Sequence, residues 1–267
     1  MLSEQDGRFL PEPFIFNTKT TSNARDLFYT YDALAHFQTS NIKDATQKDT
    51  ATADFLELQA LGRAIAQTNP AQVDKKVFKT ALDQMSKSSV VLIDEIDKAP
   101  RDFSNDILNE IENYHFEIKE QENYKIEKGS DQQILVIMTS NSEKNLPDAF
   151  LRRCIFYHIP FPDRELLLKI VKAQIGVNQS DFQFTDQALT SIIGQFDTIR
   201  KKSTRKKPAT AELVSWIRML GINGYMQKNS KAQKELMLQN LSILVKTQED
   251  LGAVQNLLKE ATQSKPE

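Results

Sequence analysis

Three apolar runs stand out in the hydrophobic pattern of residues 1–160. They cover residues 90–93 (VVLI), 134–138 (ILVIM) and 155–159 (IFYHI). A run without regular polar alternation is typical of a strand buried on both faces, as in the parallel sheet of an α/β domain. Residues 14–16 (FIF) predict a further short strand. The pattern therefore predicts a parallel sheet in this part of the chain.

Apolar residues at helical spacing separate these runs. They predict helices at about 24–37, 55–68, 77–85, 100–112 and 147–153. Residues 115–118 and 124–127 flank a polar turn and predict a small hairpin. Residues 38–53 are polar and rich in threonine, which predicts a loop.

Beyond Pro162 the pattern is helical only. The predicted helices cover about 163–175, 185–196, 209–220, 231–245 and 248–260. We therefore predict an α/β domain over residues 1–161 and an all-helical domain over residues 162–267.

The amino-acid composition indicates a cellular compartment but no ligand. The formal net charge of -2 gives no indication of nucleic acid or anionic lipid as a partner. The single cysteine, Cys154, excludes an internal disulfide framework and is interpreted as a small buried residue in a reducing compartment. No apolar run has membrane-spanning length, and the first residues do not resemble a signal peptide. We expect a cytoplasmic protein with no membrane partner.

The candidate chemistry follows the ends of the apolar runs. Asp94 and Glu95 come directly after the first run, Asn141 follows the second, and Arg152 and Arg153 precede the third. Ligands of open α/β sheets bind at the carboxyl ends of the strands, and ionised carboxylates there need a partner or a metal. This arrangement predicts a magnesium-and-water site. The alternatives are a structural strand end and, for Asn141, a turn cap.

Other polar residues near this site have simpler interpretations. Asp97 and Lys98 are interpreted as solvated. The three histidines, at positions 36, 115 and 158, are too scattered to predict a metal cluster.

The order of these features resembles an AAA+ ATPase. VVLIDEIDKAP is similar to a Walker B strand, IMTSN to sensor 1 and LPDAFLRRC to an arginine-finger segment. The longer stretches NTKTTSNARDLFYTYDAL and TSNSEKNLPDAFLRRCIFYHIPFPD resemble more narrowly the MoxR-like branch. The resemblance implies a P-loop NTPase-type parallel sheet followed by a helical lid.

The resemblance also implies ATP and Mg²⁺ as cofactors and a role for each residue. Asp94 would hold Mg²⁺, through water, and Glu95 would act as general base. Asn141 would orient the attacking water or the γ-phosphate. Arg153 or Arg152 would act as a finger in a neighbouring subunit's site. The implied assembly is a homo-oligomeric ring, a hexamer, that remodels a protein client, with a von Willebrand factor A domain protein as a partner.

A basic run, RKKSTRKK, covers residues 200–207 and precedes Pro208. The family carries sensor 2 at this place, a cation that contacts the γ-phosphate. Here the matching helix start reads KPATAEL without the usual arginine, so Lys206 or Lys207 would take that role. The alternatives are a solvated loop and a patch for nucleic acid, which a single short run in a nearly neutral protein does not favour.

The pattern G-x-x-x-x-G-K-[ST] does not occur, because none of the eight glycines is followed by lysine. In the family, the first strand and phosphate loop precede the strand that matches residues 14–16, and only thirteen residues stand before Phe14. We therefore expect a chain truncated before the phosphate loop. It would expose a hydrophobic sheet face and hydrolyse ATP poorly. The alternative is a non-catalytic scaffold or ring partner that donates Arg153 to an intact subunit.

Overall fold

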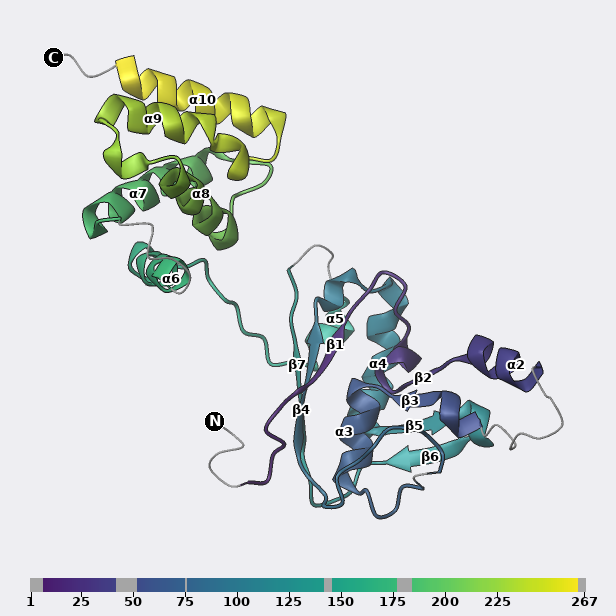
Figure 1. The fold of residues 1–267 in the computed structure, drawn as a ribbon. Helices are drawn as coiled ribbons and strands as arrows, with labels where there is room; N and C mark the ends of the chain where they lie inside the picture. Colours follow the sequence, from purple (N-terminus) through teal and green to yellow (C-terminus); the bar gives the residue numbers. More distant parts are fainter. Residues whose placement is uncertain (1–6, 42–51, 75, 142–145, 177–183, 264–267) are drawn as a thin grey trace. The chain divides into compact units, whose positions relative to one another are not determined.

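A computed structural model describes residues 7–41, 52–74, 76–141, 146–176 and 184–263. Its contacts divide the chain into two compact units, Met1–Tyr157 and His158–Glu267. This division falls a few residues before Pro162. Each unit is described by itself (Figure 1).

The first unit is built on a three-stranded parallel sheet with the order β1-β4-β7. The strands are β1 (Phe14–Asn17), β4 (Ser89–Asp94) and β7 (Ile134–Met138). Asn17 lies opposite Asp94, and Ile93 lies opposite Met138, so all three strands end at the same edge of the sheet. The strands predicted at 14–16, 90–93 and 134–138 are confirmed, and so is the α/β class.

Two antiparallel pairs accompany the sheet. The predicted hairpin is confirmed as β5 (His115–Ile118) and β6 (Tyr124–Glu127). The other pair, β2 (Tyr29–Tyr31) and β3 (Leu56–Leu58), lies where helices were predicted, at 24–37 and 55–68. The aromatic stretch of β2 pairs with a distant segment, and this tertiary pairing overrides the local helical spacing.

Apart from α4, which has its predicted length, the α-helices of this unit are shorter than their predictions. The α-helices are α2 (Ala33–Asn41), α3 (Ala60–Thr68), α4 (Arg101–Asn113) and α5 (Asp148–Leu151). The 3₁₀ turns are η1 (Ala24–Leu27), η2 (Thr52–Phe55), η3 (Ile96–Lys98) and η4 (Lys119–Gln121). Residues 77–85 form no helix, contrary to the prediction. Their backbone bonds instead to neighbouring elements: Lys79 N–H donates to Leu56 O, and Asp83 N–H donates to the Gln67 side chain.

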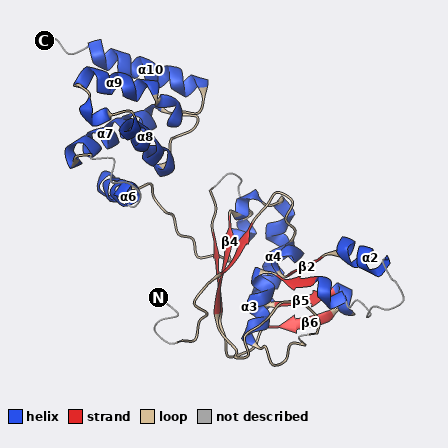
Figure 2. Ribbon diagram, viewed as in Figure 1, coloured by secondary structure: helices blue, strands red, loops and turns tan. Residues whose placement is uncertain are grey.

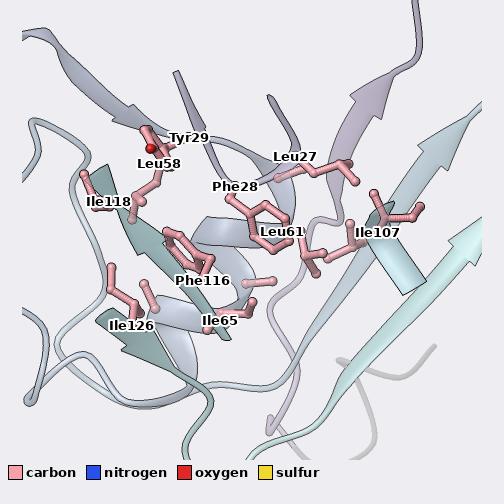
Figure 3. Packing of buried hydrophobic residues seen from close by; sticks show 14 of the residues in the cluster. Leu27, Phe28, Tyr29, Leu58, Leu61, Ile65, Ile107, Phe116, Ile118 and Ile126 are labelled. Carbon is pink, nitrogen blue, oxygen red and sulfur yellow. The ribbon is translucent and has the colours of Figure 1, made fainter. Parts of the chain in front are cut away.

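The core of the first unit lies on the face of the sheet that α3 and α4 cover (Figure 2). Val91 and Ile93 are completely buried there, and the Phe103 ring of α4 stacks on Phe16 at 6.3 Å. Around α3 the same core continues to the hairpin, where Phe28 and Phe116 stack at 5.1 Å (Figure 3). These contacts fix α4, which follows the Asp94–Glu95 pair, against the sheet.

The opposite face of the sheet is largely uncovered by the described residues of the first unit. Ile15 is 56% exposed, and Leu135 and Ile137 are 45% exposed each. The strand predicted at residues 155–159 is wrong: this segment is extended without strand pairing, and Ile155 is fully exposed. An apolar run forms a strand only where a hydrogen-bonding neighbour is available. In the described part of the chain, β7 is an edge strand.

The second unit is entirely helical within its described residues. Its helices are α6 (Arg164–Gly176), α7 (Asp186–Lys202), α8 (Thr210–Ile222), α9 (Ser230–Gln239) and α10 (Gln248–Gln263), with 3₁₀ turns η5 (Tyr225–Gln227) and η6 (Leu241–Ile243). All five predicted helices are present, but the one predicted at 231–245 ends at Gln239. Trp216 and Phe196 are completely buried in their core. Phe161 joins this core, because its ring stacks on Phe196 at 6.2 Å and lies 3.6 Å from the Arg200 guanidinium.

Candidate functional site

The acid pair lies at the carboxyl edge of the parallel sheet, where β4 and β7 end side by side. Thr139, the residue after β7, joins the two acids through its hydroxyl group. Its Oγ1 donates to Asp94 Oδ1 at 2.5 Å and accepts the Glu95 backbone N–H at 2.9 Å. The end of one strand therefore orients the acidic end of its neighbour.

The backbone at Glu95 turns sharply out of the strand. Its φ of 54° and ψ of 49° lie in the left-handed region, which a residue with a Cβ atom occupies only at a cost. The next backbone N–H, from Ile96, donates to Thr139 O at 2.9 Å and holds this turn against β7. Strained backbone of this kind clusters at functional sites, where surrounding contacts maintain it.

Asn141 reaches the Glu95 carboxylate from the end of β7. Its Nδ2 donates to Glu95 Oε1 at 3.0 Å, and its backbone N–H donates to Asp97 Oδ1 at 3.3 Å. The Lys98 ammonium group forms an ion pair with Glu95 Oε2. Asp94, Glu95 and Asn141, which are separated by up to 47 positions in the sequence, are thus neighbours at one edge.

The interpretation of Asp97 as a solvated residue is wrong, whereas Lys98 is partly exposed. Asp97 is only 2% exposed, and the Lys98 side chain is 37% exposed and paired with Glu95. The turn η3 explains the burial of Asp97, because Ile96 and Asp97 are the buried residues of this turn.

The donor set at this edge fits a hydrated magnesium ion. Asp94 is half-buried and offers a carboxylate beside the Thr139 hydroxyl. Among the described residues, no group of three or more His, Cys, Asp or Glu side chains could hold a metal alone. Mg²⁺ is commonly bound through one or two carboxylates, with water and substrate phosphates completing its shell. The residues therefore suit Mg²⁺ held jointly with a phosphate ligand.

The candidate finger arginines lie directly after α5. Arg153 Nη1 donates to Ala149 O at 3.1 Å, and its Nε lies 3.8 Å from Glu112 of α4. Arg152 is exposed. Phe150, 2% exposed, anchors the short helix in the core, so both arginines are presented on the surface of the first unit. Glu112 of α4 is the ion-pair partner of Arg153.

The basic run lies in the helical unit between α7 and α8. Lys206 and Lys207 are exposed, whereas Arg200 is used structurally: its guanidinium donates to Pro208 O and stacks on Phe161. Burial lowers the pKa of Arg200. The backbone of this loop is held by the Asp250 carboxylate.

Asp250, in the first turn of α10, holds this loop by its backbone. It accepts the N–H groups of Thr204, Arg205 and Lys206 at 2.9, 3.2 and 3.1 Å. These hydrogen bonds, led by that from Thr204, lower the pKa of Asp250 from 3.8 to about 2. The exposed lysines therefore project from a loop whose backbone is ordered.

Three contributors were missed from the sequence. Thr139 directly follows the strand β7, and its position at the strand end was the available signal. Lys98 lies three residues after Glu95, and its ammonium pairs with the Glu95 carboxylate across the turn η3. Asp250 is 44 residues or more from its partners, and no sequence pattern marks it.

Residues 16–188 of the chain match the family described as AAA domain (Cdc48 subfamily). A similar solved structure is that of a candidate ATPase from Cytophaga hutchinsonii, at 12% sequence identity and a TM-score of 0.36. The match covers 97% of this chain and 77% of that one. No curated protein matches the chain significantly. No helix in the described ranges is long and apolar enough to cross a membrane.

Proposed function

Because the chain belongs to the AAA domain family (Cdc48 subfamily), we propose that it is a MoxR-like AAA+ ATPase subunit that remodels or chaperones a protein client. Members of this family bind ATP with Mg²⁺ and commonly form oligomeric rings. A cytoplasmic hexamer and a von Willebrand factor A domain partner are part of the proposal. The observation that carries it is the 3.0 Å contact between Asn141 Nδ2 and Glu95 Oε1, beside Asp94.

The geometry supports a division of roles at the carboxyl edge. Asp94, fixed by Thr139, would hold Mg²⁺ through water, and the ion would neutralise charge on the phosphates. Glu95 would accept the proton of the attacking water as general base. Asn141, which already contacts the carboxylate of Glu95, would orient that water or the γ-phosphate. Phosphoryl transfer relies mainly on such positioning and electrostatic stabilisation.

The cations would act from outside this cluster. Arg153, or Arg152 beside it, is proposed as the finger that enters a neighbouring subunit's site. Their surface position after α5 is compatible with that role. Lys206 or Lys207 is proposed as the sensor 2 cation, and the loop held by Asp250 would present it.

A second candidate function is a non-catalytic ring partner that donates Arg153 to an intact subunit. The absence of G-x-x-x-x-G-K-[ST] from the sequence favours it, because backbone amides and lysine of that loop form the usual phosphate cradle. For the same reason we expect slow ATP hydrolysis by residues 1–267 when they are assayed alone. The retained Asp94, Glu95 and Asn141 cluster favours the first candidate.

The deciding experiment measures Mg²⁺-dependent ATP turnover and retention of bound ATP. The protein is assayed alone and mixed with a MoxR-like subunit that carries a phosphate loop. For the first function, Glu95→Gln lowers the turnover by about 10²–10⁴ and retains ATP, because it removes the base and leaves the binding groups. Glu117→Gln is the matched control, since this exposed acid lies on the hairpin strand β5.

The ring-partner function gives a different result. Turnover then arises only in the mixture, is insensitive to Glu95→Gln, and falls by about 10³–10⁵ with Arg153→Ala. Turnover that responds to neither substitution would exclude both functions.

A further inference from the structure

Both oxygens of the Glu95 carboxylate are occupied in this structure. Asn141 Nδ2 donates to Oε1 at 3.0 Å from the neighbouring strand end. The Lys98 ammonium donates to Oε2 from the turn that follows the acid pair. The two contacts come from different segments, and together they leave neither oxygen without a protein donor.

The contact with Lys98 is built into the local fold. The 3₁₀ turn η3 (Ile96–Lys98) is closed by the Lys98 N–H, which donates to Glu95 O at 2.9 Å. Ile96 and Asp97 are 1% and 2% exposed, so the backbone of this turn is fixed by burial. Glu95 precedes this turn in the left-handed region and Lys98 ends it, and the ammonium lies beside the Glu95 carboxylate.

A general base needs an oxygen that faces the water whose proton it accepts. In the observed arrangement the Lys98 ammonium competes with that water for Oε2. We propose that Lys98 is a positioning residue that holds Glu95 in a blocked resting conformation, and that its release is required before Glu95 activates water. The proposal rests on the proposed role of Glu95 as base.

The pair is suited to reversible release. The side chains of Lys98 and Glu95 are 37% and 34% exposed, so water can replace each partner as the pair separates. Ion pairs of this exposure are weak and are screened by salt. Asn141 retains its own anchor, the backbone contact with Asp97, when Lys98 leaves.

The first measurement does not depend on hydrolysis. Trace labelling with acetic anhydride, followed by mass spectrometry, gives the relative acylation rate of each lysine in the folded protein. An ion-paired ammonium is a poor nucleophile, so Glu95→Gln should raise the Lys98 rate several-fold. The exposed Lys231 of the helical unit is the internal reference, and its rate should stay constant. If Glu95→Gln leaves the acylation rate of Lys98 unchanged, the proposal that Lys98 holds Glu95 is overturned, whether or not the protein hydrolyses ATP.

The second measurement distinguishes two roles of Lys98: holding Glu95 in the resting conformation, or contacting a phosphate of ATP. Under the proposal, Lys98→Met raises kcat several-fold with little change in KM, and Lys98→Arg restores the wild-type values. A lower kcat, or a higher KM with kcat unchanged, overturns the proposal. Turnover that is insensitive to Glu95→Gln instead counts against the proposed function, and the labelling result still decides whether the pair exists.

Discussion

The two units differ in how far their described residues enclose their apolar surface. The helical unit buries its largest side chains completely, with Trp216 and Phe196 at 0% exposure. The sheet of the first unit buries Val91 and Ile93 on one face and leaves Ile15 56% exposed on the other. A bundle of successive helices can close a core by itself, whereas this sheet has a second apolar face that the described elements of its own unit leave largely uncovered.

The origin of the difference is the distance along the chain between contacting elements. Residues 18–88 separate β1 from its neighbour β4, while the helices of the second unit follow one another with short connections. Pairing distant segments costs more chain entropy than packing adjacent ones. The sheet thus depends more heavily on each of its long-range partners.

The largest effect is expected from truncating the centre of the helical core. Trp216→Ala should lower the free energy of unfolding of the helical unit by about 3–5 kcal/mol, because it removes a completely buried ring. Thermal unfolding followed by far-UV circular dichroism measures the loss. Met219→Ala on the same helix is the control, since Met219 is 37% exposed. Equal losses for both would contradict the enclosed core.

Substitutions of two glycines, one in each unit, test the difference between the units. A Cβ at Gly62 would lie 1.9 Å from Phe28 O, so Gly62→Ala should destabilise the first unit by about 1–3 kcal/mol or more. In α7, a Cβ at Gly194 meets nothing within 4 Å, and Gly194→Ala should stabilise the second unit by about 0.5–1 kcal/mol.

The only tryptophan of the chain, Trp216, reports on the second unit alone by fluorescence. In denaturant unfolding, Gly62→Ala should therefore lower the midpoint that is measured by circular dichroism. It should leave the midpoint that is measured by fluorescence unchanged. Gly194→Ala should raise the fluorescence midpoint. A shift of both signals by both variants would mean that the units unfold together.

A smaller effect is expected from the carboxylate that holds the basic loop. The pKa of Asp250 is lowered from 3.8 to about 2, so its stabilising contribution is complete above the ordinary value and is lost as the pH falls from about 4 toward 2. Asp250→Asn should lower the fluorescence midpoint at pH 7, and the difference from wild type should shrink as the pH falls through this range. A difference that is independent of pH would rule out the charged contact.

The smallest effect is expected on the uncovered face of the sheet. Leu135→Ser and Ile137→Ser should each change the free energy of unfolding by no more than about 0.5 kcal/mol, because both side chains are 45% exposed. Val91→Ser, on the covered face, should cost several times more. Urea unfolding followed by circular dichroism measures all three, and a large loss at Ile137 would show that this face is covered.

Much of the framework could be predicted from the sequence because it depends on local patterns. The hairpin, the three paired strands and the five helices of the second unit follow from periodicity and punctuation. The proximity of Asp94, Glu95 and Asn141 follows from their shared position after parallel strands. The predictions at 77–85 and 155–159 failed because the backbone of the first bonds to Leu56 and Gln67, and the second has no strand partner among the described residues.

The details of the site depended on contacts that no local pattern encodes. A threonine after a strand is common, so nothing marked Thr139 as the hydroxyl that joins two acids. Asp97 was misjudged because charged residues are usually exposed, and only the turn at Glu95 brings it under the strand end. The roles of Arg152, Arg153, Lys206 and Lys207 stay predictions.

The left-handed backbone at Glu95 also limits which amino acids can occupy this position. Glycine and asparagine adopt φ near +54° more readily than glutamate, so both should relax the turn while deleting the carboxylate. A selection for thermal tolerance alone would then enrich replacements at this position, and a selection for catalysis would reject them. Position 95 is therefore a place where evolutionary pressures for robustness and for chemistry oppose each other.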